Sequence, residues 1–300
     1  PQLERRRQRV STAAPPLKLG TRGSPLALAQ AAQVAAAIEW PLELITITTS
    51  GDGGKAPAED KRRWVDRIED ALLAGEIDLA VHSAKDVPVA LADGLAIAGA
   101  PERGDPRDVL CGASSIAELP LGARVGTSSL RRAAQLRALR EDIAIVPIAG
   151  NVDTRLRRLE QEDLDAIVLA RAGLSRLGGR QLGSPLDELV PAVGQGTLAI
   201  EARLGDARVA PAIAALRHPP TERELSAERS LARALGVGCR TPIGAHATSL
   251  PNGTLELRAF VGLPDGSLWM RDRLTGEDPQ ALGEAVAERL QSVGVDAFLE

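Results

Sequence analysis

Short apolar segments alternate with stretches of helical periodicity along the first hundred residues. Val65, Ile68 and Leu72 recur at the spacing of one helical face. The pattern predicts strands at 17–20, 42–48 and 77–82 and helices at 25–38 and 65–74. Strands that alternate with helices favour an α/β architecture built on mainly parallel sheets.

The same alternation resumes after the charged, turn-rich segment 101–107. It predicts strands at 124–125, 143–148 and 165–170 and helices at 130–139 and 154–160. Turn-forming sequences at 191–196 and 218–220 interrupt the chain again. The last block predicts a helix near 221–235, a strand pair at 255–261 and 267–272 and a helix near 279–292. Because 300 residues is long for one hydrophobic core, these blocks predict two or three domains.

Composition narrows the classes of partner. The net charge of -4 provides no general attraction to nucleic acid or to an anionic membrane. Aromatic residues make up 2% of the chain, which argues against platforms for stacking nucleic-acid bases. No apolar run approaches the roughly 20 residues that a membrane-spanning helix needs. Any basic surface on this protein must therefore be local.

Residues 1–16 differ from the rest of the chain. They contain four arginines and one acid and end in a Ser-Thr-Ala-Ala-Pro-Pro run. We expect a disordered extension. The alternative is the remnant of a transit peptide, since such peptides are also rich in arginine and poor in acids.

Arginines follow the ends of several predicted strands, where helices begin. Arg131 and Arg132 follow Ser129, a candidate helix cap, and Arg155 follows Asn151 in the same way. Cations in a first helical turn oppose the helix dipole. They become favourable where a bound anion meets both guanidinium and backbone N–H groups. The repetition predicts an anionic ligand, and the alternative for any single arginine is a solvated surface charge.

Lys85 and Asp86 follow the strand predicted at 77–82. An acid beside a base at a strand end can serve in general acid/base catalysis or hold a cationic intermediate. A surface ion pair is the alternative, and this segment alone does not decide between them.

The two cysteines lie in different surroundings. Cys239 lies in a glycine-rich loop beside Arg240, which favours the nucleophilic thiolate, whereas Cys111 has the surroundings of a buried strand residue. Other reactive motifs are missing. Segment 49–56 fails the P-loop pattern, the three histidines are scattered, and the chain contains no GxSxG sequence.

Five segments, in order, resemble the porphobilinogen deaminase family, whose members are also called hydroxymethylbilane synthases. They read TRGSPLA at 21–27, VHSAKDVP at 81–88, GTSSLRR at 126–132, PAVGQG at 191–196 and GCRTPIG at 238–244. The resemblance runs from about residue 17 to the C-terminus. It implies a transferase of tetrapyrrole biosynthesis that joins four porphobilinogen molecules head to tail, releases ammonia and hydrolyses off hydroxymethylbilane. It also implies a dipyrromethane cofactor, attached through a thioether to Cys239.

The resemblance further implies roles for individual residues. Asp86 is the expected catalytic group, which contacts pyrrole nitrogens and stabilises positively charged intermediates. The expected cofactor-binding residues are Cys239, Lys85, Thr127, Ser129, Arg131 and Arg132. The expected substrate-binding residues are Arg22, Ser24, Gln30, Arg155, Arg176 and Gln195, with Lys61 and Trp64 as loop candidates. No metal is expected.

The family fold implies three α/β domains. The first two resemble a hinged type-II periplasmic binding protein with the active cleft between them, and the third is a small α/β domain that carries the cofactor cysteine. The implied bounds are 17–101 plus 196–217, then 102–195, then 218–300. A monomer in the cytoplasm is expected, or an organellar protein if 1–16 are a transit remnant.

The chain departs from the family pattern in places. Ala149 stands where an arginine is usual, so one carboxylate-binding group is missing, and Asp153 replaces a glycine and brings an acid toward Arg155. Arg171 is a candidate replacement for the missing arginine. The alternative function is a non-catalytic or impaired anion-binding homologue.

Overall fold

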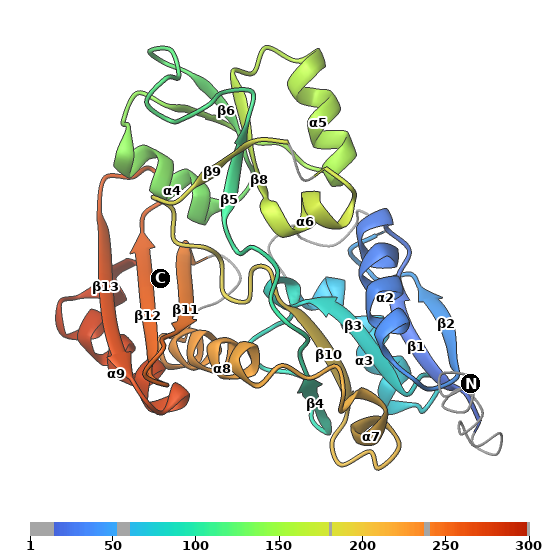
Figure 1. Cartoon of the computed structure of the whole chain (residues 1–300). Helices are drawn as coiled ribbons and strands as arrows, with labels where there is room; N and C mark the ends of the chain where they lie inside the picture. Colours follow the sequence, from blue (N-terminus) through green and yellow to red (C-terminus); the bar gives the residue numbers. More distant parts are fainter. Residues whose placement is uncertain (1–14, 53–60, 180–181, 237–240, 299–300) are drawn as a thin grey trace.

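The computed structural model describes residues 15–52, 61–179, 182–236 and 241–298 (Figure 1). Within these ranges the strands form three sheets. The first sheet has the order β2(Leu42–Ile47), β1(Leu17–Arg22), β3(Leu79–Ser83), β10(Leu198–Arg203), β4(Leu95–Gly99). The second has the order β7(Ala144–Val146), β6(Arg124–Gly126), β8(Ala166–Ala170), β5(Asp108–Cys111), β9(Ser184–Leu186). The third has the order β11(Ile243–Ser249), β12(Leu255–Gly262), β13(Trp269–Gly276).

The first two sheets have the same topology. In each, three parallel strands are followed by one antiparallel strand, β10 in the first sheet and β5 in the second. Each antiparallel strand comes from the part of the chain that has crossed over from the other sheet. The expected α/β class is therefore confirmed. The pairing of β10 with β3 and β4 supports the assignment of 196–217 to the first domain, whose bounds stay a prediction.

Helices cover both faces of the first two sheets and one face of the third. In the first sheet, α2(Pro25–Ala37) and α7(Val209–Ile213) pack on one face and α3(Asp66–Leu73) on the other. In the second, α4(Leu130–Leu139) lies opposite α5(Val152–Gln161) and α6(Arg171–Arg176). In the third, α8(Pro219–Ala234) and α9(Pro279–Ser292) bury one face, and on the other face Phe260 packs against Ala134 of α4. None of the described helices is both long and apolar enough to cross a membrane.

Two crossing segments connect the first two sheets and run side by side (Figure 1). The N–H of Gly104 donates to the carbonyl of Gly196 at 3.2 Å. Gly196 has a φ of 91°, and a Cβ at this position would lie 2.5 Å from the Gly104 oxygen. Only glycine combines this backbone conformation with so close an approach, so the crossing depends on it.

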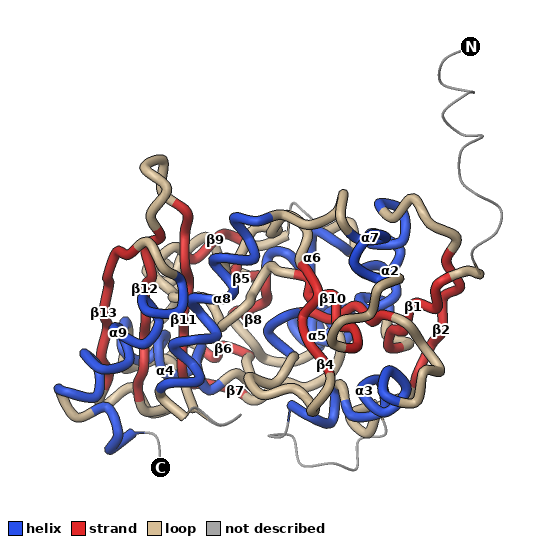
Figure 2. Tube along the Cα trace, turned by 90° about the horizontal axis from the view of Figure 1, so that it is seen from below, coloured by secondary structure: helices blue, strands red, loops and turns tan. Residues whose placement is uncertain are grey.

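Glu228 of α8 joins the crossing segments to the third sheet. Its buried carboxylate accepts hydrogen bonds from the Arg103 guanidinium at 2.6 Å, from the N–H of Gly194 at 2.6 Å and from the N–H of Ala247 in β11 at 2.9 Å. Figure 2 shows the third sheet at one end of the molecule and the first sheet at the other. Glu228 therefore anchors the end of the molecule that bears the C-terminal sheet.

Several elements differ from the sequence predictions. The helices predicted at 130–139 and 279–292 are confirmed with the same bounds, and the helix predicted at 154–160 begins earlier, at Val152. The prediction did not include β4, β9, β10, β11, α6 or α7. β11 contains glycine and polar residues, and β10 is fixed by its neighbours β3 and β4 rather than by its own alternation. The predicted extension 1–16 falls almost wholly outside the described residues.

Candidate active site

A pocket lies at the carboxyl ends of β1 and β3, which are parallel neighbours in the first sheet. The ends of parallel strands meet at one sheet edge, where open α/β folds bind ligands. Five of the residues predicted to form the site line this pocket: Arg22, Ser24, Gln30, Trp64 and Asp86. The structure therefore brings together residues that are up to 64 positions apart in the chain.

The wall that α2 contributes is fixed by local hydrogen bonds. Ser24 caps α2, because its hydroxyl accepts the N–H of Ala27 at 3.3 Å, and Pro25 occupies the first helical turn. Gln30, one turn further along, is buried and donates its amide N–H to the Ser83 hydroxyl at 3.1 Å. This bond links α2 to the strand end that carries Lys85 and Asp86.

Arg22 is held on the opposite side by partners that the sequence analysis did not identify. Its guanidinium pairs with Asp52 and lies 4.2 Å from the centre of the Trp64 ring. Burial opposes ionisation of Asp52, but hydrogen bonds from Arg22 and Thr49 hold its pKa below the usual value. Asp52 therefore orients Arg22, which agrees with a site built around cations.

Lys85 and Asp86 lie in the short 3-10 turn that follows β3. Among the described residues, neither the ammonium of Lys85 nor the carboxylate of Asp86 has a hydrogen-bond or ion-pair partner. Burial lowers the pKa of Lys85 to about 8, the nearby Asp86 partly offsets this, and Arg132 lowers it further. Half-buried charges without protein partners are typical of a binding site rather than of a surface ion pair.

The start of α4 contains the second group of predicted residues. Ser129 caps the helix through the N–H of Arg132 at 3.4 Å, and the hydroxyl of the buried Thr127 accepts the N–H of Ser129 at 3.1 Å. Asn151 occupies the N-cap position of α5 as predicted, but its side chain makes no cap hydrogen bond.

Arg131 and Arg132 turn inward, onto a buried carboxylate. Both guanidiniums bond to Asp108 of β5, with N–O distances of 2.7 Å. Gln195 donates to the same carboxylate at 3.0 Å. Burial opposes ionisation of Asp108, but the two arginines hold its pKa well below the usual range. The sequence motif predicts that these arginines bind an anion. It does not indicate that this anion is the carboxylate of Asp108, which lies 23 residues before Arg131 in the chain.

Arg155 of α5 and Arg176 of α6 are two cations beside the second sheet whose charge is not neutralised by an ion pair within the described ranges. Arg155 donates to the carbonyl of Gly150 at 2.8 Å, and burial and then Arg132 lower its pKa, against the effect of Asp86. Arg176 donates to the carbonyl of Gly196 at 2.7 Å, and burial lowers its pKa to about 10. Neither guanidinium has a carboxylate partner within the described ranges.

The departures from the family pattern lie at the surface. Ala149 and Asp153 are exposed, and Asp153 makes no ion pair with Arg155. The Arg171 guanidinium points at the carbonyls of Leu182 and Gly183, 3.4 and 3.3 Å away. In this conformation Arg171 does not replace the missing arginine.

Some predicted residues are only partly described. Cys239 lies outside the described residues, and so does the side chain of Lys61, which opens the 3-10 turn before Trp64. Cys111 is buried in β5 as expected, and burial raises the pKa of its thiol to about 11. Such a thiol is unreactive at neutral pH.

The sequence analysis also missed a buried pair beneath the pocket. His82, which lines the pocket, has its Nε2 2.9 Å from Oε2 of Glu201 in the neighbouring strand β10. Glu201 is fully buried. The sequence contained one sign of such buried carboxylates, an acid within an otherwise apolar strand. Glu201 in β10 and Asp108 in β5 are both of this kind.

Comparisons with known proteins agree over nearly the whole chain. Residues 17–211 match the family described as porphobilinogen deaminase, dipyromethane cofactor binding domain, and residues 223–292 match porphobilinogen deaminase, C-terminal domain. The chain is 46% identical to the porphobilinogen deaminase of Syntrophobacter fumaroxidans over 300 residues, which is 95% of this chain and 97% of that protein. It is 47% identical to that of Rubrobacter xylanophilus over 296 residues, covering 94% and 96% of the two chains.

Among solved structures, a nutrient binding protein from Burkholderia cenocepacia bound to methionine is similar, with 12% identity and a TM-score of 0.43. The similarity covers 68% of this chain and 93% of that one. Two domain matches and relatives of this identity and coverage decide the question of family. The chain belongs to the porphobilinogen deaminase family.

Proposed function

We propose that the chain is a hydroxymethylbilane synthase. It adds four porphobilinogen molecules head to tail to a covalently bound dipyrromethane, releases ammonia at each addition and hydrolyses off the linear tetrapyrrole. The main support is the turn that contains Lys85 and Asp86, whose two charges have no described protein partner. This turn follows β3 at the edge of the pocket that Arg22 and Gln30 also line. The proposal includes a monomer in the cytoplasm, which light scattering and cell fractionation would test.

The residues present fit a carboxylate-bearing pyrrole chain. Lys85, Arg155 and Arg176 are cations whose pKa values burial lowers, so a ligand carboxylate would relieve an existing cost. Guanidinium and ammonium groups are the usual partners of carboxylates. Lys85, Ser129 and the cysteine at 239 would hold the dipyrromethane, with Thr127, Arg131 and Arg132 fixing the start of α4 beside it. When bound, this cofactor would supply the pyrrole carbon that joins the first substrate, and each added ring would supply that carbon for the next.

Asp86 would act on the incoming substrate. Its carboxylate is an acceptor free of described protein donors, so it can accept the pyrrole N–H of porphobilinogen. Positive charge develops on the substrate as ammonia leaves, and a fixed carboxylate in a poorly hydrated pocket stabilises that charge strongly. Arg22, Ser24 and Gln30 would bind the acetate and propionate groups and orient the ring.

The substitution Asp86→Asn tests this role. The amide keeps the shape but removes the negative charge, so bilane formation should fall by at least about a hundredfold. Ammonia release and bilane formation from porphobilinogen measure the effect. The matched control is Asp93→Asn, because Asp93 is exposed and has no described partner. Wild-type rates in the Asp86 variant, with the fold intact by circular dichroism, would remove Asp86 from the mechanism.

An impaired anion-binding homologue is the second candidate, and one observation favours it. Ala149 offers no side-chain donor, and Arg171 is directed at backbone carbonyls instead of covering that role. Such a protein would bind pyrrole carboxylates without turnover even when it carries the cofactor.

A further inference from the structure

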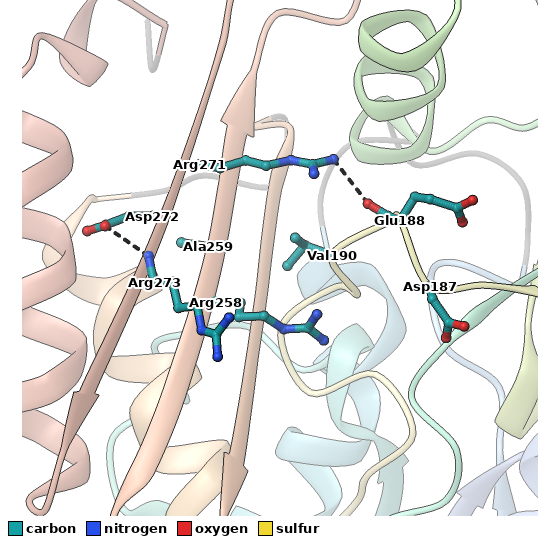
Figure 3. A pocket seen from close by; sticks show the side chains of 8 residues that line it. All are labelled: Asp187, Glu188, Val190, Arg258, Ala259, Arg271, Asp272 and Arg273. Atoms are coloured by element: carbon teal, nitrogen blue, oxygen red, sulfur yellow. Dashed lines mark hydrogen bonds between the residues drawn. The ribbon is translucent and has the colours of Figure 1, made fainter.

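A second cavity of about 470 Å³ lies between the outer face of the β12–β13 pair and the segment 187–190 (Figure 3). Its volume is within the range of about 300–1,000 Å³ that small-molecule sites occupy. It shares no lining residue with the candidate active-site pocket. The first two sheets are covered by helices on both faces, but this face of the third sheet is only partly covered, so the cavity is open to solutes.

Three arginines from two strands line this cavity. Arg258 of β12 and Arg273 of β13 are direct partners across the strand ladder, and Arg271 lies two residues away on the same face of β13. Like charges directly opposite each other destabilise a sheet. The repulsion between Arg258 and Arg273 therefore destabilises the sheet, and a bound anion would reduce it.

The acids around the cavity pair with cations other than Arg258 and Arg271 or point away from them. Asp187 pairs with Arg107 at 3.2 Å. Asp272 pairs with Arg289 at 2.7 Å, and Glu256 pairs with Arg273. Figure 3 shows the carboxylate of Glu188 directed away from Arg258 and Arg271. Within the described ranges, Arg258 is left without a hydrogen bond or an ion pair.

Arg271 is held in position but keeps unused donors. It gives one hydrogen bond, of 3.0 Å, to the carbonyl of Glu188, and its guanidinium lies 5.7 and 5.6 Å from the ring centres of Phe260 and Trp269. Burial and then the positive charge of Arg258 lower its pKa, so the charged form of Arg271 is disfavoured in this cavity. A guanidinium already fixed by its neighbours loses little entropy when it binds an anion.

We propose that this cavity is a second anion site, which binds a small molecule carrying two or more negatively charged oxygen groups between Arg258 and Arg271. A bound anion would lie against Val190, whose carbonyl accepts the Arg131 guanidinium at 2.7 Å on the other side of the segment. The site is thus a neighbour of the start of α4 without being part of the candidate active site. The proposal stands independently of the proposed catalytic function.

Isothermal titration calorimetry of the full-length, cofactor-bearing protein tests the proposal. Citrate and inorganic phosphate are titrated separately, and acetate, which carries a single charge, is the control. We expect citrate or phosphate to bind, and Arg258→Gln to weaken this binding about tenfold or more, because a charge-assisted hydrogen bond is lost. Arg67→Gln, which removes an exposed arginine of α3, should leave the affinity unchanged. Binding of citrate alone assigns a polycarboxylate, and binding of phosphate alone assigns a phosphate compound.

A stability measurement separates ligand binding from a structural role. Without added anion, Arg258→Gln should unfold at the same temperature as the wild type or higher, because it relieves the repulsion of Arg273. The same variant should lose the rise in Tm that the anion produces in the wild type. Three results would overturn the proposal: no anion bound at millimolar concentration, acetate bound as well as citrate, or binding lost in Arg22→Gln but kept in Arg258→Gln.

Discussion

Buried or half-buried cations without carboxylate partners mark the site at the scale of single residues. Burial lowers the pKa of Lys85 to about 8 and that of Arg176 to about 10, and it lowers the pKa of Arg155 as well. Each shift means that the folded protein disfavours the charged form. A ligand with several carboxylates would reverse this penalty at each position that it contacts, so binding such a ligand would also stabilise the fold.

Lys85 provides a pH prediction with a definite sign. Its pKa falls from 10.5 to about 8 on folding, so between these values the unfolded chain binds more protons and the stability contributed by this group rises with pH. Below pH 8 the penalty is fully present. In protein prepared without dipyrromethane, amine labelling of Lys85 should therefore show a midpoint near pH 8.

The cofactor-bearing protein provides the comparison for this experiment. A carboxylate beside the ammonium favours its charged form, so labelling of Lys85 should become slower and its midpoint should rise. Mass spectrometry of the Lys85 peptide measures both, with the exposed Lys18 as internal reference. A midpoint in the cofactor-free protein as high as that of a free lysine would contradict the structure of this turn.

At the scale of elements, the helix starts divide into two kinds. The start of α2 presents Arg22 and Ser24 to a pocket, whereas the start of α4 turns Arg131 and Arg132 onto Asp108. The start of α5 is a third case, because Ala149 precedes it and the side chain of its N-cap residue, Asn151, makes no cap hydrogen bond. Of these helix starts, only that of α2 presents its side chains to a pocket where a ligand could bind without rearrangement of the protein.

The α5 start provides a prediction by gain of function. Ala149 is exposed, so Ala149→Arg needs no repacking and restores the donor that the family usually has there. One charge-assisted hydrogen bond to a ligand carboxylate should raise bilane formation by about tenfold. Turnover of porphobilinogen measures it, and Ala149→Gln, which has similar reach but no charge, is the matched control. An unchanged rate would mean that another group already covers this role.

Elements with their own start signals could be predicted from the sequence. The helices at 130–139 and 279–292 were found with correct bounds, because a capping residue precedes each and apolar residues recur along one face. β10 and β11 were not, since their pairing partners decide their conformation. The pocket residues follow from motifs at strand ends. The Asp108 and Asp52 partners could not be predicted, because ion pairs between distant segments leave no local pattern.

On the scale of the whole molecule, Glu228 holds the C-terminal sheet against the two crossing segments. Burial opposes its ionisation, but Arg103 and then His246 lower its pKa to about 2. Because the folded pKa lies below the usual 4.5, this group stabilises the protein above pH 4.5, and the contribution is lost as pH falls toward 2. Acid should therefore loosen this junction between parts of the molecule.

The substitution Glu228→Gln tests the junction. It removes the carboxylate 2.6 Å from the Arg103 guanidinium and leaves only Glu224, 3.8 Å away, which should lower the free energy of unfolding by about 3–5 kcal/mol. Urea unfolding measures the change. Glu288→Gln on the exposed side of α9 should stay within about 0.5 kcal/mol of wild type. Equal stabilities of the two variants would show that the Glu228 network does not hold the third sheet in place.

The central claim is that a pyrrole chain is anchored to this protein and presented to Asp86. The intact mass of the denatured protein tests it most directly. We predict a mass above that of the sequence by two linked pyrrole units, with the adduct on the peptide that contains Cys239 and none on the peptide of the buried Cys111. An unmodified mass in protein that forms no bilane from porphobilinogen, or an adduct on Cys111, would contradict the account.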